Sequence, residues 1–203
     1  MLFNGKRLFE RLNNLRWETQ LGISTRGIVD VDKPDSLYYA TINYSMIQSV
    51  LQHLSLGSSD TFVDVGCGKG RVLCCAARHP CKKVVGVDYS EDLCRLARTN
   101  LQRLRGRTAP VVVHKGVAEE FDYTEATALF FFNPFGATTL DAVLHKINHD
   151  TRQQNVRFVF VNASPEQDEV FARHTWLERY DFWSGDRGAQ PVSYYRRKRA
   201  AVA

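Results

Sequence analysis

Five short apolar runs recur along the chain, and all but the third are followed by a turn and a predicted helix. They occupy residues 61–65, 83–87, 111–114, 127–132 and 156–161. Runs of this length indicate strands. The fourth lacks any alternation of apolar and polar residues, which is typical of a strand covered on both faces. The regular alternation predicts an α/β fold of the Rossmann-like kind, with a mostly parallel sheet and helices on both faces.

Helix signals fill the intervals between the runs. Ser90 precedes two acidic residues and is predicted to cap a helix that ends before Gly106. Ser164 followed by Pro165 is a second good helix start. Apolar stripes at helical spacing mark three helices, and their members are Ile47, Val50, Leu51 and Leu54, then Leu93, Leu96, Ala97, Leu101 and Leu104, then Leu140, Val143, Leu144 and Ile147.

The two ends of the chain depart from this alternation. Residues 176–183 and 192–197 are predicted strands around a turn at 184–190, which gives a C-terminal antiparallel hairpin and a seven-stranded sheet. Near the N-terminus, four residues share one helical stripe with arginines off it: Leu8, Phe9, Leu12 and Leu15. We predict a helix packed on the domain, with a basic amphipathic surface anchor as the alternative. We divide the chain into an N-terminal helix and loop extension, 1–36, and one domain, 37–203.

Residues 62–73 are the stretch around which the other signals are arranged. A run containing Asp64 leads through alternating glycines into a helical stretch, which is the first half of a nucleotide-binding unit. The glycines are Gly66, Gly68 and Gly70. Their spacing differs from the G-x-G-x-x-G of dinucleotide sites, which disfavours NAD-dependent redox chemistry, and the P-loop Lys-Ser or Lys-Thr pair is missing. The next run ends in Asp88, at about the distance where such folds place a ribose-binding carboxylate.

Asp-x-Gly-x-Gly-x-Gly followed by a strand ending in an acid resembles motif I and its partner in the class I S-adenosylmethionine (SAM) methyltransferases. The resemblance implies SAM as cofactor, with Asp88 accepting bonds from both ribose hydroxyls and Tyr89 bordering the adenine. The methionine part of SAM would face Asp64 and the backbone of Gly66, Cys67, Gly68 and Gly70. Val117 stands where many of these enzymes have an acid for the adenine amino group, so Ala118 or Glu119 is expected to take that contact.

Asn133-Pro134-Phe135 follows the fourth run, at the catalytic-loop position of the family. It resembles the (D/N)PP(Y/F) motif of enzymes that methylate planar nitrogens, without the second proline. In those enzymes the Asn side chain and a following carbonyl accept hydrogen bonds from the target amine, and an aromatic ring stacks on it. Asn133 and Phe135 are therefore the catalytic candidates, with Pro134 and Phe135 at the substrate. The alternative is a strand-ending turn that only lines the cofactor pocket.

A second resemblance covers residues 38 to about 145. Tyr-x-x-Thr-x-x-Tyr, the glycine motif and an Asn-x-Phe loop recur in the non-SET histone lysine methyltransferases and in small bacterial and mitochondrial enzymes of that kind. It implies a protein lysine or another amine as methyl acceptor, with Tyr39, Thr41 and Tyr44 near it. A nucleic-acid base as acceptor and a non-catalytic SAM-binding scaffold stay open.

Charge and cysteine usage add less to this picture. The formal net charge is +5, and a solvated surface explains it as well as an acidic or nucleic-acid partner does, since no nucleic-acid motif accompanies it. The five cysteines form no CxxC pair and suit core filling in a reducing compartment, so we expect a cytoplasmic protein. No apolar stretch is long enough to span a membrane. His145 and His149 lack an H-E-x-x-H pattern and a third ligand, so we expect no metal.

Overall fold

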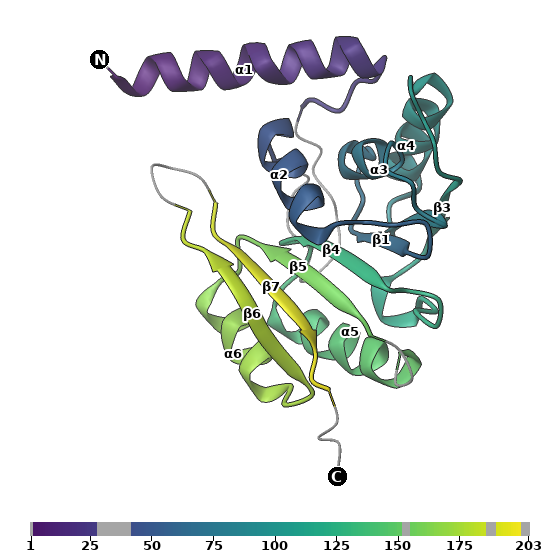
Figure 1. Ribbon diagram of the computed structural model, residues 1–203, viewed down its shortest axis with the longest axis vertical. Helices are drawn as coiled ribbons and strands as arrows, with labels where there is room; N and C mark the ends of the chain where they lie inside the picture. Colours follow the sequence, from purple (N-terminus) through teal and green to yellow (C-terminus); the bar gives the residue numbers. More distant parts are fainter. Residues whose placement is uncertain (1, 28–41, 152–154, 186–189, 200–203) are drawn as a thin grey trace.

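A seven-stranded sheet forms the middle layer of the computed structural model, which describes residues 2–27, 42–151, 155–185 and 190–199 (Figure 1). The strand order is β3-β2-β1-β4-β5-β7-β6. The parallel strands are β1 (Thr61–Val65), β2 (Lys83–Asp88), β3 (Val111–Lys115), β4 (Ala128–Phe132) and β5 (Arg157–Val161). The hairpin strands are β6 (Leu177–Trp183) and β7 (Val192–Arg197). The predicted sheet, with its antiparallel hairpin, is confirmed.

Strand directions decide which loops share an edge of the sheet. β7 is antiparallel to both β5 and β6, so β6 runs in the same direction as the five parallel strands. The hairpin turn therefore starts at the edge that also carries the glycine turn. The strand order reverses between β1 and β4, and open α/β sheets bind ligands at the carboxyl ends of strands beside such a switch point.

Helices cover both faces of the sheet and bury two apolar clusters (Figure 1). One face carries α2 (Tyr44–Leu54), α3 (Arg71–Ala76) and α4 (Glu91–Arg103), and the other carries α5 (Ala137–Asp150) and α6 (Pro165–Arg173). Phe62 faces the first cluster and Val63 the second, because neighbouring strand residues point to opposite faces. Each large apolar side chain buried in this way contributes about 1.5–3 kcal/mol. All five cysteines are buried and unpaired, as predicted.

The predicted helix starts are present, but one position assigned to the apolar stripe of α4 is exposed. Ser90 Oγ accepts a bond from the amide of Leu93 at 3.3 Å, and Ser164 forms a capping box with Gln167. Leu96, assigned to the apolar stripe of α4, is 37% exposed. It lies at the margin of the stripe, while Leu93 and Ala97 are buried.

Helix α1 (Leu2–Leu21) forms as predicted, but the face that packs on the domain is not the face that we predicted. Its stripe is exposed: Leu8 by 59%, Phe9 by 70%, Leu12 by 58% and Leu15 by 42%. The opposite side makes the contact, with the ring of Trp17 stacked on Tyr44 at 5.9 Å. In Figure 1, α1 runs along the top of the molecule, and its N-terminal half extends beyond the other elements. The spacing identified an apolar face correctly, but not whether anything covers it.

A buried ion pair joins the end of α1 to the start of α3. Arg71 Nη2 lies 3.3 Å from Glu18 Oε1, and both side chains are almost fully buried. Arg71 also donates from Nε to Thr25 Oγ1 at 2.7 Å and from Nη1 to the carbonyl of Ile42 at 2.8 Å. Its guanidinium lies 4.6 Å from the ring centroid of Tyr44. Because Arg71 is the first residue of α3, these bonds fix the glycine turn to the N-terminal segment.

Two further side chains tie the same segment to the glycine turn. Asn100 on α4 accepts from the amide of Ser24 at 3.0 Å and donates to the carbonyls of Ser24 and Lys69 at 3.0 and 2.9 Å. Lys69 Nζ donates to the carbonyl of Arg26 at 2.6 Å. Residues 18–27 are thus bonded directly to the nucleotide-binding unit. The boundary that we drew between residues 36 and 37 lies outside the described residues.

Glu18→Ala is expected to destabilise the fold strongly. It leaves the Arg71 guanidinium buried without its counter-charge, and breaking a buried pair in this way typically removes about 3–5 kcal/mol. Urea denaturation followed by circular dichroism measures the change in the free energy of unfolding. The control is Glu10→Ala on the same helix, which has no ion pair within the described part of the chain and should change stability by less than about 0.5 kcal/mol. Equal losses for the two variants would show that the buried pair contributes nothing specific.

Candidate functional site

The glycine turn joins β1 to α3 at the carboxyl edge of the sheet. Gly66, Gly68 and Gly70 have φ angles of 77°, 53° and 80°, in the left-handed region that is strained for other residues. The amides of Gly66 and Cys67 donate to the carbonyl of Val87 at 2.8 and 3.0 Å. The turn is therefore held against the end of β2, beside Asp88.

Asp88 closes this arrangement with its carboxylate. Oδ2 accepts from the amide of Gly68 at 2.8 Å, and Oδ1 accepts from the amide of Ser90 at 2.9 Å. Burial raises the pKa of Asp88, and these two amide bonds oppose the rise. Each carboxylate oxygen keeps a second lone pair, so Asp88 can accept further bonds from a ligand. The structure thus brings together the turn and the second acid that the sequence singled out.

Asp64 brings a second carboxyl to the same place. It is buried within β1, and its Oδ2 accepts no hydrogen bond from the described residues. Burial, and then the charge of Asp88, raise the pKa of Asp64 to about 8, against a bond from the Leu73 amide. Two buried acids near a glycine turn repel a phosphate but favour a cationic ligand. This electrostatic character separates the site from a dinucleotide site more sharply than the glycine spacing does.

Gly86 is a site residue that the sequence analysis did not assign. A Cβ at this position would collide with the Leu73 side chain and would lie 2.8 Å from Cys67 Sγ. Glycine on β2 is therefore what allows α3 and the turn to close on the sheet. Cys67 itself is buried, and burial raises the pKa of its thiol, so it packs rather than reacts.

The Asn133 loop meets the glycine turn across the switch point. A Cβ at Gly66 would lie 2.5 Å from Pro134 Cβ, so the two loops touch. Asn133 has a positive φ of 39°. Gln167 of α6, which is buried, donates from Nε2 to Asn133 Oδ1 at 2.8 Å and to the carbonyl of Phe135 at 2.7 Å. The orientation of the Asn133 side chain is thus set by α6, through a residue that the sequence analysis treated only as part of a helix.

The aromatic residues predicted at the substrate lie in the core. Phe135 is 6% exposed and packs edge-on against Phe131 at 6.3 Å. Tyr44 has no exposed surface, and its ring contacts both Trp17 and the Arg71 guanidinium. Tyr39 and Thr41 lie outside the described residues.

The loop after β3 reaches the same edge. The amide of Gly116 donates to the carbonyl of Asp88 at 3.0 Å, which starts this loop beside the second acid. Ala118 and Glu119 begin the short helix η1 (Ala118–Glu120), and the Ala118 carbonyl accepts from the Tyr123 hydroxyl at 2.9 Å. Tyr89 is half-buried directly after Asp88. The segments expected around the adenine therefore converge at this edge.

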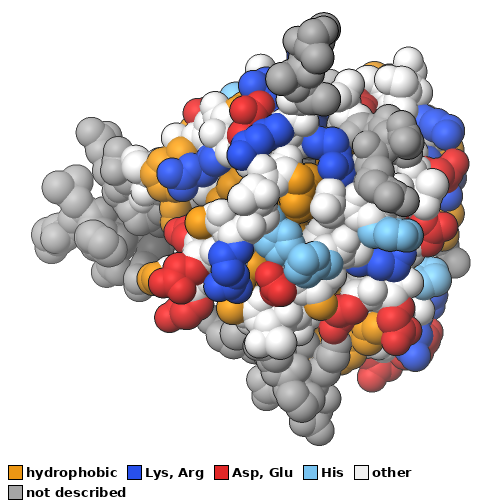
Figure 2. Space-filling view, turned by 90° about the horizontal axis from the view of Figure 1, so that it is seen from below, with side chains coloured by type: hydrophobic (Ala, Val, Ile, Leu, Met, Phe, Trp, Pro, Cys, Tyr) orange, Lys and Arg blue, Asp and Glu red, His pale blue; other side chains and the backbone are white. Residues whose placement is uncertain are grey.

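A histidine cluster lies away from this edge, between α5 and the end of α6. Asp141, His145 and His174 could offer three metal ligands, and Figure 2 shows histidines among mixed charges on the face opposite α1. The indole of Trp176 donates to His174 Nδ1 at 3.2 Å, so His174 Nε2 carries the proton and donates to Asp141 Oδ1 at 3.0 Å. That nitrogen then has no lone pair for a metal. The cluster is best explained as a hydrogen-bonded link between two helices.

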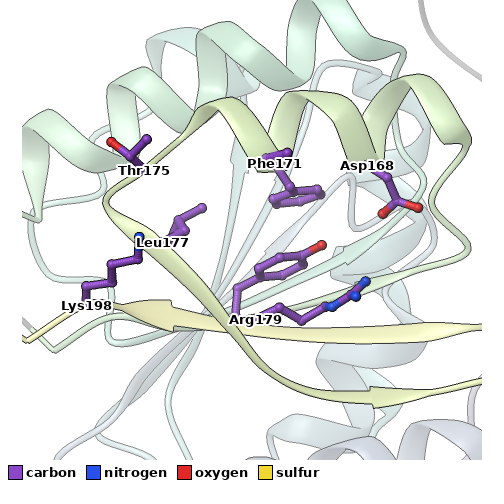
Figure 3. Close-up of a pocket in the computed structure, with 8 residues that line it drawn as sticks. Asp168, Phe171, Thr175, Leu177, Arg179 and Lys198 are labelled. Carbon is purple, nitrogen blue, oxygen red and sulfur yellow. The ribbon is translucent and has the colours of Figure 1, made fainter.

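A hollow of about 400 Å³ between α6 and the hairpin contains none of the predicted site residues. Phe171 and Tyr195 are among the residues that line it, and their rings are stacked with centroids 4.2 Å apart. Asp168 and Arg179 lie at one end and Lys198 at the other (Figure 3). It is separate from the edge that carries the two acids.

Asp64→Asn is expected to stabilise the ligand-free protein at high pH. The pKa of Asp64 rises from 3.8 to about 8 on folding, so the unfolded chain loses this proton first. The stability of the wild type therefore falls as pH rises between these values, by at most about 1.4 kcal/mol per pH unit. The amide has no such proton, so this slope disappears. Thermal unfolding at several pH values compares the wild type with Asp64→Asn and with the exposed control Asp92→Asn. A wild-type slope retained in Asp64→Asn would contradict the assignment.

Sequence comparisons point to methyltransferases. The family model described as Histone methylation protein DOT1 matches residues 33–119. A protein-lysine N-methyltransferase from Saccharolobus islandicus is 30% identical over 95 residues, which is 46% of this chain and 58% of that protein. The H3 lysine-79 specific histone-lysine N-methyltransferase of Drosophila melanogaster is 31% identical over 101 residues, which is 43% of this chain and 5% of that protein. The chain thus spans less than two thirds of these curated relatives.

Solved structures share the fold at lower identity. An RNA methyltransferase from Salinibacter ruber, in complex with S-adenosyl-L-homocysteine, aligns with a TM-score of 0.63 and 20% identity over 79% of this chain and 95% of that chain. A SAM-dependent O-methyltransferase from Thermotoga maritima aligns with a TM-score of 0.59 and 17% identity over 80% of this chain and 69% of that chain. With this sheet, the glycine motif and its two acids, the chain has the fold of the class I SAM-dependent methyltransferases, whose cofactor is S-adenosylmethionine, and part of its sequence is similar to the DOT1 histone methylation family.

Proposed function

We propose that this chain transfers a methyl group from SAM to an amine nitrogen, with the side chain of a protein lysine as the favoured acceptor. The observation that carries the proposal is the contact between Gly66 and Pro134. Through this contact the glycine turn, the two buried acids and Asn133 lie close together at one switch point of the sheet. The two lysine methyltransferases described above, similar over part of this chain, support the acceptor class.

The residues at the switch point fit the cofactor by charge and by hydrogen bonding. SAM, when bound, supplies an electrophilic methyl group on a sulfonium cation. Asp64 Oδ2, which has no hydrogen-bond partner among the described residues, suits a cationic group, and a nearby cation would favour its ionised form. Cofactor binding and proton release from Asp64 are then linked. The remaining lone pairs of Asp88 suit the ribose hydroxyls.

Asn133 is suited to orient an amine rather than to deprotonate it. Its Oδ1 accepts from Gln167 and keeps a second lone pair for a hydrogen bond from the acceptor. A side-chain amide neither gains nor loses a proton at ordinary pH, so its contribution is to position the acceptor. A planar base would instead need an open ring to stack on, and Phe135 is packed in the core. This burial favours an amine acceptor over a nucleic-acid base.

Asp88→Asn is expected to weaken SAM binding on the order of tenfold or more. The variant keeps the shape but loses the charge, and hydrogen bonds to a charged group contribute about 1.5–3 kcal/mol each. Isothermal titration calorimetry with SAM measures the affinity. Asp92→Asn, an exposed acid on α4, is the matched control and should bind as the wild type does. Wild-type affinity in Asp88→Asn would remove Asp88 from the cofactor site.

The purified chain should incorporate label from methyl-labelled SAM into protein, and acid hydrolysis should release methylated lysine. Asn133→Ala should lower the initial rate on the order of a hundredfold, as the loss of one preorganised polar contact does, with little change in SAM affinity. Label in nucleic acid would show that the acceptor class is wrong. SAM binding without any turnover would indicate a non-catalytic SAM-binding protein.

Gln167→Leu in the same assay separates positioning from cofactor binding. It removes both bonds that hold the Asn133 loop, so turnover should fall while SAM affinity persists. Gln102→Leu, at an exposed position of α4, controls for the loss of a glutamine amide. A parallel fall of turnover and SAM affinity in Asn133→Ala and Gln167→Leu would make the loop a wall of the cofactor pocket only.

A further inference from the structure

The outer side of α1 carries an apolar stripe that no described residue covers. Leu8, Leu12 and Leu15 follow one another at helical spacing, Phe9 lies beside them, and each is between 42% and 70% exposed. Four large apolar side chains in one exposed row are unusual for a surface helix, which normally turns such a stripe inward.

The helix cannot turn this stripe inward without breaking its existing contacts. Its opposite side already holds Trp17 against Tyr44 and Glu18 against Arg71, and Leu21 is buried. The Glu18 pair is itself buried, so rotating the helix would expose or unpair two charges. The stripe is therefore directed outward by the same bonds that hold the glycine turn.

Exposed arginines flank the three leucines of the stripe on both sides. At about 100° per residue, Arg11 lies roughly 60° to one side of Leu8 and Arg16 roughly 80° to the other. Both side chains are exposed, and within the described residues neither has an ion-pair partner. Cations at the edges of an apolar stripe meet the headgroups when such a helix lies in a membrane surface.

We propose that α1 docks on an anionic lipid surface, lying in its plane with the apolar stripe inserted and the two arginines at the headgroups. A second copy is a poorer occupant, because stripe-to-stripe contact would bring four arginines together. A nucleic acid backbone would leave the three exposed leucines without an apolar partner. None of the described helices is long and apolar enough to cross a membrane. The proposal does not depend on the proposed function.

Vesicle flotation tests the proposal with the whole chain. The wild type should float with vesicles of phosphatidylcholine and phosphatidylglycerol, and much less with phosphatidylcholine alone. The double variant Leu8→Glu with Leu12→Glu should reduce this partitioning on the order of tenfold or more, since burial of apolar area drives it. Leu96→Glu, an exposed leucine on α4, is the matched control and should float as the wild type does. Circular dichroism checks that each variant is folded.

Charge reversal separates a lipid surface from the other occupants. Arg11→Glu with Arg16→Glu should abolish the preference for anionic vesicles, because each arginine near such a surface contributes roughly fivefold. Wild-type chain that does not float with anionic vesicles would overturn the proposal, as would stripe variants that float equally well. So would light scattering that finds a wild-type dimer and a monomeric stripe variant, since the stripe would then be a dimer interface.

Discussion

The burial of the Arg71 guanidinium is the constraint on which the arrangement of the site depends. A guanidinium out of water needs a partner for its donors and a counter-charge. Glu18, Thr25 and the carbonyl of Ile42 supply them. These partners come from a segment that precedes the first strand, so the segment must fold over the start of α3. Arg71 directly follows the glycine turn, and the geometry of the turn therefore depends on residues far away in the sequence.

The electrostatics of the switch point oppose the stability of the free protein. Asp64 and Asp88 are both buried. The charge of Asp88 raises the pKa of Asp64, and the charges of both acids raise the pKa of the Cys67 thiol. A fold selected only for stability would neutralise one of them. A cationic ligand would supply the missing charge, so the pair of acids that weakens the folded chain on its own would strengthen binding of such a ligand. Buried carboxyl groups with raised pKa values are typical of functional sites.

Helix α1 connects two surfaces with different roles. At its C-terminal end, Glu18 holds the glycine turn through Arg71. Farther toward the N-terminus, Leu8 and Leu12 face outward beside Arg11. Because one rigid element carries both, docking of the outer stripe would set the orientation of the carboxyl edge of the sheet relative to the docking surface. Figure 1 shows this helix running along that end of the molecule.

The sequence by itself determined the features that rest on local signals. Apolar runs located the strands of the sheet, Ser90 and Ser164 marked helix starts, and the glycine spacing with Asp64 and Asp88 located the candidate site. Tertiary structure alone decided the outer face of α1, the burial of Arg71 and the bond from Gln167 to Asn133. The physical reason is that periodicity shows which residues share a face but not what covers it. A buried polar group, moreover, is satisfied by partners that only the folded chain brings within reach.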